Sequence, residues 1–332
     1  MTWDMLGHEW AETLLRKHMA HGDVRHAYLF TGPPGVGRRS LALRFAQALN
    51  CPQPTALGEP CRQCRTCTQI ESMQHADLSV VAAESMGGVL KVDTVRELQH
   101  SLSLTAYQSP YRVGLLLRFE EANASAQNAL LKTLEEAPEK VILLLTADEA
   151  ENLLPTIVSR CEVLRLRPLG IDALEQALAD RWNVPAEEAP LLAHLSGGRV
   201  GAALAHWNEP DLRNKRSEWL QDLIDLLTEP LRARFAYAER FKTTERETIR
   251  QGLQVWLSFW RDVLLAASGA QVPLVNLECE AEIQSVAQAV GMQTALRCTT
   301  DLQTALARLD NNLNRQMLLE VTLMDLPRLG YP

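Results

Sequence analysis

The sequence predicts an α/β domain with a parallel sheet, followed by an all-α region. Short apolar runs alternate with amphipathic stretches over the first half of the chain, a pattern typical of a doubly wound sheet. The runs at 113–117 and 141–146 are almost wholly apolar, as expected for strands covered on both faces. After residue 169 no further strand pattern occurs. These observations together predict a sheet domain joined to helical domains.

The expected elements follow in order along the first half. Residues 9–19 form an amphipathic helical pattern with Trp10, Leu14 and Leu15 on one face. Asp93 is expected to cap a later helix. The other expected helices are 41–49 and 125–136. The expected strands are 27–31, 78–82, 113–117, 141–146 and 163–166.

We expect three domains, at 1–168, 169–206 and 207–332. The second is a small helical unit with helices at 171–182, 185–195 and 200–207. The third carries several apolar stripes at helical spacing, one of which includes Trp256 and Trp260. Core packing is the ordinary interpretation of such a pair.

Composition restricts the function classes. The chain has 332 residues, 46% of them hydrophobic, so disorder is excluded. Its 33 basic and 41 acidic residues give a net charge of −8, which disfavours nucleic-acid binding over the whole surface. No apolar run approaches the roughly 20 residues that span a bilayer, and no signal-peptide pattern opens the sequence. We therefore expect a cytoplasmic protein that makes no contact with membranes.

A glycine-rich turn follows the first expected strand. Gly32, Gly35 and Gly37 match the phosphate-binding pattern GxxxxGK[ST], in which backbone N–H groups surround phosphate oxygens. Arg38 stands at the lysine position, and Arg39 stands where a hydroxyl should bind Mg²⁺. A cation cannot ligate a cation, so we expect no hydrolysis of ATP here. Binding of a phosphate or nucleotide through the amides and Arg38 stays open.

The acidic pair that normally holds Mg²⁺ at the end of a neighbouring strand is also missing. Leu117 and Arg118 occupy that place. Glu120 and Glu121 lie past the strand end, where a solvated loop is expected. An alternative hypothesis is an active ATPase in which Arg38 replaces the lysine and one of these glutamates replaces the missing acid.

Four of the seven cysteines lie close together in the sequence, within 51–67. Cys51, Cys61, Cys64 and Cys67 have the spacing of a tetrahedral four-sulfur site, which favours structural zinc. An iron–sulfur cluster and an inert cysteine cluster are the alternatives. A zinc module that binds nucleic acid is a further hypothesis, although no extended basic run supports it.

Ser159 and Arg160 follow a short helical segment just before the last expected strand. Such an arginine often forms a surface ion pair or caps the helix. In a domain with a phosphate-binding loop, it could instead be an arginine finger that reaches the ATP of a neighbouring subunit.

The segments 26–33, 128–138 and 154–161, together with the four cysteines, resemble the clamp-loader subunits of bacterial DNA polymerase III, which are AAA+ proteins. The similarity runs from Leu6 to about Leu204 and returns between Asn312 and Leu326. The resemblance implies an AAA+ sheet domain with an inserted zinc module, a small helical lid and a C-terminal helical collar. The altered loop and the missing acids resemble the delta-prime class of subunit and not the ATPase motor class.

The resemblance also implies partners and residue roles. Delta-prime-like subunits work in a heteropentamer with motor subunits and a delta subunit, which loads the sliding clamp on primed DNA. Arg160 would then reach the ATP site of the adjacent motor subunit, and Thr146 would occupy the sensor 1 position. The sensor 2 position falls on Ala202, with Arg199 nearby but out of register.

Two further expectations follow from the assembly that the resemblance implies. The stripe with Trp256 and Trp260 would pack against other subunits in the collar. Lys91 and Arg96 are candidates for DNA contact inside the spiral of subunits.

Overall fold

The computed structural model describes residues 3–309 and 314–330. The chain forms two compact units. The first contains the residues up to Leu169 together with Arg199–Gly201, and the second contains Gly170–Gly198 and the chain from Ala202 onward. The division into three domains at 1–168, 169–206 and 207–332 stays a prediction.

A five-stranded parallel sheet forms the centre of the first unit, in the order β2-β3-β4-β1-β5. All five expected strands are present, with bounds that differ by no more than one residue at either end. β4 is buried along its whole length, as its apolar sequence predicts. The strands are β1 (Ala27–Thr31), β2 (Leu78–Val81), β3 (Arg112–Leu116), β4 (Val141–Ala147) and β5 (Glu162–Arg165).

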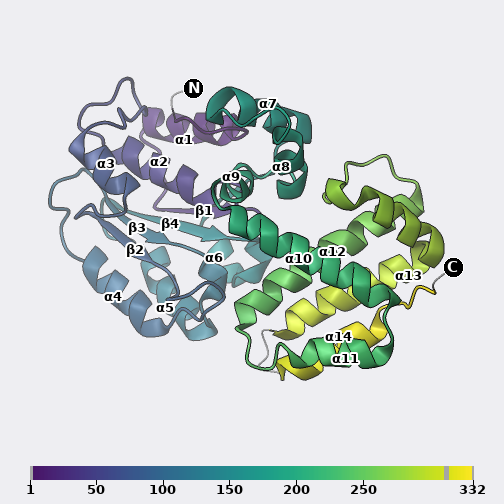
Figure 1. The fold of residues 1–332 in the computed structure, drawn as a ribbon. Coiled ribbons are helices and arrows are strands. Elements are labelled where there is room, and N and C mark those ends of the chain that lie inside the picture. The colour runs from purple at the N-terminus through teal and green to yellow at the C-terminus, as the bar shows by residue number, and fades with distance from the viewer. Residues whose placement is uncertain (1–2, 310–313, 331–332) are drawn as a thin grey trace. The chain divides into compact units, whose positions relative to one another are not determined.

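Helices cover both faces of this sheet (Figure 1). Tyr28 and Phe30 of β1 pack in one apolar cluster, while Ala27 and Leu29 pack in the other, so alternate residues face opposite layers. The first layer holds α1 (Glu9–His21), α2 (Arg38–Asn50) and α3 (Arg65–Glu71). The second holds α4 (Val92–Leu102), α5 (Ala124–Glu135) and α6 (Pro155–Val158), and two 3-10 turns, η1 (Phe119–Glu121) and η2 (Ala150–Asn152), join the elements.

Three local expectations were wrong. Asp93 does not cap α4, because the helix begins at Val92 and Lys91 is its N-cap; Asp93 instead lies in the first turn, where its charge complements the helix dipole. Trp10 is 48% exposed, whereas Leu15 on the same helix is fully buried. The helix expected at 185–195 begins only at Ala189.

The described residues of the second unit form helices and no strand. The helix α9 (Val200–Asn208) begins in the short segment that belongs to the first unit. The predicted C-terminal helix begins at Arg315 and is capped by the Asn314 side chain, whereas Asn312 lies outside the described residues. The other elements are α7 (Ile171–Trp182), α8 (Ala189–Ser196), α10 (Pro210–Thr228), α11 (Leu231–Glu239), α12 (Arg246–Ser268), η3 (Leu277–Cys279), α13 (Glu280–Leu309) and α14 (Arg315–Asp325).

Trp256 and Trp260 belong to the core of the second unit. Both rings are fully buried within this chain, among the apolar side chains of α10, α12 and α13. The Trp256 indole N–H donates to the backbone oxygen of Trp219 at 2.8 Å. Their expected role in contacting other subunits was therefore wrong, because no part of either side chain is left to meet a partner.

None of the described helices is long and apolar enough to cross a membrane.

Candidate functional site

The glycine-rich turn joins β1 to α2 in the manner of a phosphate-binding loop. Gly32, Gly35 and Gly37 have φ angles of 142°, 83° and 111°, which other residues rarely adopt. The three glycines therefore stand where the backbone itself requires them. The backbone keeps the geometry of a phosphate-binding loop, although Arg38 and Arg39 occupy its lysine and hydroxyl positions.

The guanidinium of Arg38 is bound by carboxylates of its own chain. Arg38 opens α2, and its side chain is only 10% exposed. Its Nη1 atom lies 2.6 Å from Oδ1 of Asp148 and 4.0 Å from Oε1 of Glu120. A buried cation is stable only when it is paired, and these two acids supply the pairing. The residue that should hold a phosphate is thus already engaged.

Glu120 does not lie in a solvated loop, which corrects the expectation from the sequence. Its side chain is 17% exposed, and its Oε2 atom is buried without a hydrogen-bond partner among the described residues. Burial raises the pKa of Glu120 to about 7, and the neighbouring Asp148 adds to the rise while Arg38 opposes it. This carboxyl is therefore partly protonated at neutral pH.

Glu121 is likewise enclosed and not solvated. Its carboxylate accepts hydrogen bonds from the backbone N–H of Gly87 at 2.8 Å and from Nε of Arg118 at 2.9 Å. In each glutamate of η1, Oε1 is thus engaged within the chain, by Arg38 for Glu120 and by Gly87 and Arg118 for Glu121, while the Oε2 atoms are buried.

Asp148 was not identified from the sequence. It follows β4 directly, and β4 pairs with β1, which leads into the loop. Because the carboxyl ends of parallel strands meet at one edge of a sheet, an acid placed just after β4 must lie near Arg38. The backbone oxygen of Asp148 also accepts from Gly32 N–H at 2.9 Å, so the same residue holds both ends of the loop.

Thr146, at the predicted sensor 1 position, binds the segment that follows β3 and leads into η1. Its hydroxyl accepts from the backbone N–H of Arg118 at 2.9 Å. Arg118 is one of the two residues that replace the missing acidic pair. The two positions are thus linked to each other by a hydrogen bond.

Three carbonyls of the loop are also engaged within the first unit. His8 bonds to the backbone oxygen of Val36 at 2.8 Å. Arg199 donates to Pro34 at 3.2 Å, and Gly201 N–H donates to Gly35 at 2.8 Å. Arg199 therefore contacts the loop backbone although it is out of register with the sensor 2 position.

Arg160 lies just after the short helix α6, on the far side of the sheet from α1 and α2. Its Nη2 atom is 2.6 Å from Oε1 of Glu135, and its Nη1 donates to the backbone oxygen of Thr156 at 2.9 Å. The side chain remains 34% exposed. Ser159 donates to the same Thr156 oxygen at 3.2 Å, so it closes the end of α6.

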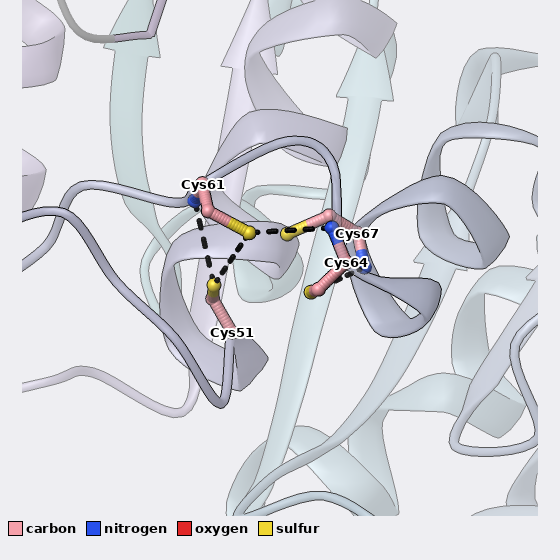
Figure 2. A group of neighbouring side chains, drawn as sticks. All are labelled: Cys51, Cys61, Cys64 and Cys67. Carbon is pink, nitrogen blue, oxygen red and sulfur yellow. Dashed lines mark hydrogen bonds between the residues drawn. The ribbon is translucent and has the colours of Figure 1, made fainter.

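The four cysteines converge on one point, as Figure 2 shows. Cys51 follows the end of α2, Cys61 comes from the loop after it, and Cys64 caps α3, which carries Cys67. All four sulfur atoms lie within 4.8 Å of one another, and none is in a disulfide. The cluster can therefore hold a metal ion.

The sulfur geometry fits a tetrahedral ion. Metal–sulfur bonds of about 2.3 Å require neighbouring sulfurs to lie about 3.8 Å apart, and those of Cys51 and Cys61 are 3.6 Å apart. Backbone N–H groups point at the sulfurs: Cys61 donates to Cys51, Cys64 to Cys61 and Cys67 to Cys64, at 3.3–3.4 Å. The backbone N–H groups of Gln63 and Cys64 lower the pKa of Cys61 to about 6, which favours the thiolate that a metal needs, whereas burial raises the pKa of Cys51 and Cys67.

Two of the basic side chains around the cysteines are paired with acids. Arg62 lies 3.0 Å from Asp4, and Arg16 lies 2.7 Å from Glu59. These pairs offset part of the positive charge that a nucleic-acid-binding zinc module would use, while Arg65 between Cys64 and Cys67 is exposed. Lys91 and Arg96 are exposed near the start of α4, where Arg96 pairs with Asp93 at 3.2 Å.

The chain matches known proteins along most of its length. A family profile described as DNA polymerase III, delta subunit matches residues 7–170, and one described as DNA polymerase III, delta subunit, C terminal matches residues 210–327. Subunit delta' of DNA polymerase III from Pseudomonas aeruginosa is 34% identical over 229 residues, 68% of each chain. The chain belongs to the delta-prime family of DNA polymerase III subunits.

The chain is also similar to other proteins. Subunit delta' from Bacillus subtilis is 29% identical over 92% of both chains. Subunit tau/gamma from Haemophilus influenzae is 35% identical, but over 60% of this chain and 29% of its own length. A solved structure of a gamma subunit-related protein from Thermotoga maritima is similar with a TM-score of 0.48 and 16% identity, over 96% of this chain and 98% of that one.

Proposed function

We propose that this protein is a non-hydrolysing subunit of the bacterial clamp loader, the assembly that uses ATP to load the sliding clamp on primed DNA. One observation carries the proposal. The guanidinium of Arg38 is held by Asp148 and Glu120 inside the phosphate-binding loop, while Arg39 stands where the Mg²⁺ ligand belongs. The loop therefore shapes the fold and does not split a triphosphate.

Arg160 then contributes to catalysis in a neighbouring motor subunit. Its guanidinium is partly exposed at the end of α6 and keeps donors free for a phosphate. A guanidinium placed on the γ-phosphate stabilises the charge that develops in the transition state. Because the arginine comes from another subunit, ATP is hydrolysed only when the assembly is complete.

The proposed assembly is a heteropentamer of motor subunits, a delta subunit and this chain, working in the cytoplasm. The chain would meet the clamp and primed DNA as part of that complex. Residues 169–206 would form the lid and residues 207–332 would join the collar. Other faces of the second unit must then make the collar contact, since Trp256 and Trp260 are buried.

We assign zinc to the four cysteines as a structural ion. All four ligands come from the protein, so no coordination position is left for a substrate. The ion would fix the irregular segment between α2 and α3, which has little apolar packing of its own. It supplies no chemistry to the ATP site.

The alternative of an ATP-hydrolysing subunit is weakened by the same contacts. Arg38 cannot serve a γ-phosphate while it is paired with Asp148, and Glu121 is occupied by Arg118 and Gly87. ATP turnover by the isolated chain above about 1 per second, within the usual range for enzymes, would reverse this conclusion.

The decisive experiment replaces Arg160 in the reconstituted complex. Arg160→Ala should leave assembly intact and sharply lower the ATP turnover stimulated by clamp and primed DNA, because single arginine fingers contribute on the order of 10³–10⁵ in rate at their own site. Arg165→Ala is the matched control, since Arg165 is an exposed arginine of the same unit that pairs with Glu151 at 3.0 Å. Unchanged turnover in assembled Arg160→Ala complex would contradict the proposed role.

A further inference from the structure

We propose that Glu135 is a positioning residue for Arg160. Its carboxylate orients the guanidinium before the ATP site of the neighbouring motor subunit binds next to it. The proposal rests on the proposed function of Arg160.

The contact leaves the guanidinium able to work. Arg160 donates one N–H of Nη2 to Oε1 of Glu135 and one N–H of Nη1 to the backbone oxygen of Thr156. Arginine has five N–H donors, so three remain for phosphate oxygens. The side chain can therefore be held from behind while its remaining donors face a ligand.

Helix α5, which ends at Glu135, and helix α6, which precedes Arg160, are joined at a second point. Gln127 of α5 is buried, and its Oε1 atom accepts from the backbone N–H of Leu154 at 2.9 Å, at the start of α6. Its Nε2 atom donates to Ala122 at 3.0 Å. Ile157 anchors α6 in the core with no exposed surface. The backbones under Glu135 and Arg160 are thus set by packing, and the ion pair adds the direction of the side chain.

The position of Glu135 argues against a role in stabilising the fold. It is the last residue of α5, where a carboxylate meets the negative end of the helix dipole. Its side chain is 52% exposed, and exposed ion pairs contribute little to stability. An unpaired arginine, in contrast, samples many rotamers, and ordering it during catalysis costs entropy. The pair is better suited to orienting Arg160 than to holding the domain together.

The test is the ATP turnover of the reconstituted complex, stimulated by clamp and primed DNA. Glu135→Ala should lower kcat about fivefold, the upper limit for an exposed pair, and leave KM for ATP unchanged. Glu135→Gln should recover most of the rate, because the amide oxygen still accepts from Arg160. Glu136→Ala is the matched control, because Glu136 is the next residue, equally acidic and exposed, and should change nothing.

A double variant separates this inference from the proposed function. If Glu135 acts through Arg160, adding Glu135→Ala to Arg160→Ala causes no further loss of rate. A further loss in that double variant, a Gln variant no faster than Ala, or unchanged or faster turnover of Glu135→Ala would each overturn the positioning role. Full activity of Arg160→Ala would instead overturn the proposed function itself.

Discussion

The pairing of Glu120 with Asp148 and Arg38 predicts a dependence of stability on pH that Glu120→Gln should remove. Burial raises the pKa of Glu120 from 4.5 to about 7 in the folded chain. Between these values the folded state holds a proton that the unfolded state has released. The free energy of unfolding therefore falls as pH rises through this window, and the cost is complete above pH 7.

The size of the effect follows from that shift. A change of one pKa unit corresponds to about 1.36 kcal/mol, so the full cost of ionising Glu120 is about 3 kcal/mol. About 2 kcal/mol of this arises between pH 5.5 and pH 8. Glutamine has the shape of the protonated acid and never ionises. The variant should therefore have a higher free energy of unfolding than the wild-type protein. The difference between the two should grow by about 2 kcal/mol from pH 5.5 to pH 8.

Hydrogen exchange of peptides from β1 and β4 measures this margin within the first unit. Wild-type and variant proteins are compared at the same pH, so the intrinsic exchange rates cancel. Glu151→Gln serves as the matched control, because it makes the same substitution at a carboxylate that is 65% exposed. A margin for Glu120→Gln that is equal at pH 5.5 and pH 8, or that shrinks as pH rises, would refute the argument.

Two further predictions concern the cysteines and the second unit. Cys64→Ser should abolish the binding of about one zinc per chain and raise exchange across 51–71; full zinc content in the variant would contradict the assignment. Trp256→Ala should destabilise the second unit by about 3–5 kcal/mol, because it removes a fully buried ring and its bond to Trp219. Loss of exchange protection in α12 and α13 of the isolated chain checks this, and unchanged protection would argue against a core role.

The strands and the cysteine cluster could be predicted because each depends on local pattern. A buried parallel strand must be apolar along its length, and β4 shows this directly. Cys61, Cys64 and Cys67 are separated from one another by two residues each, so a short stretch of chain brings them together. Such features need no knowledge of distant contacts.

The state of the phosphate-binding loop could not be predicted in full because it depends on contacts across the sheet. Arg38 and Asp148 are 110 residues apart, and their pairing depends on the order of β4 and β1. Glu120 was expected to be solvated because it lies beyond a strand. The turn η1 instead places its side chain next to Arg38 and Asp148. The burial of Trp256 was also a tertiary property, because a helical stripe has the same spacing in a core and in an interface.

Helix α2 is secured at both ends by polar chemistry. Its first residue, Arg38, is paired with two acids. Cys51 directly follows the last residue of the helix and contributes a sulfur to the cysteine cluster. Thirteen residues at 1.5 Å each give a rod about 20 Å long between them. Because ten of those residues are buried, the rod cannot flex freely along its length. Loss of the proposed zinc ion at one end would thus be transmitted to the glycine turn at the other, so that a metal site with no part in catalysis would influence the shape of the phosphate-binding loop.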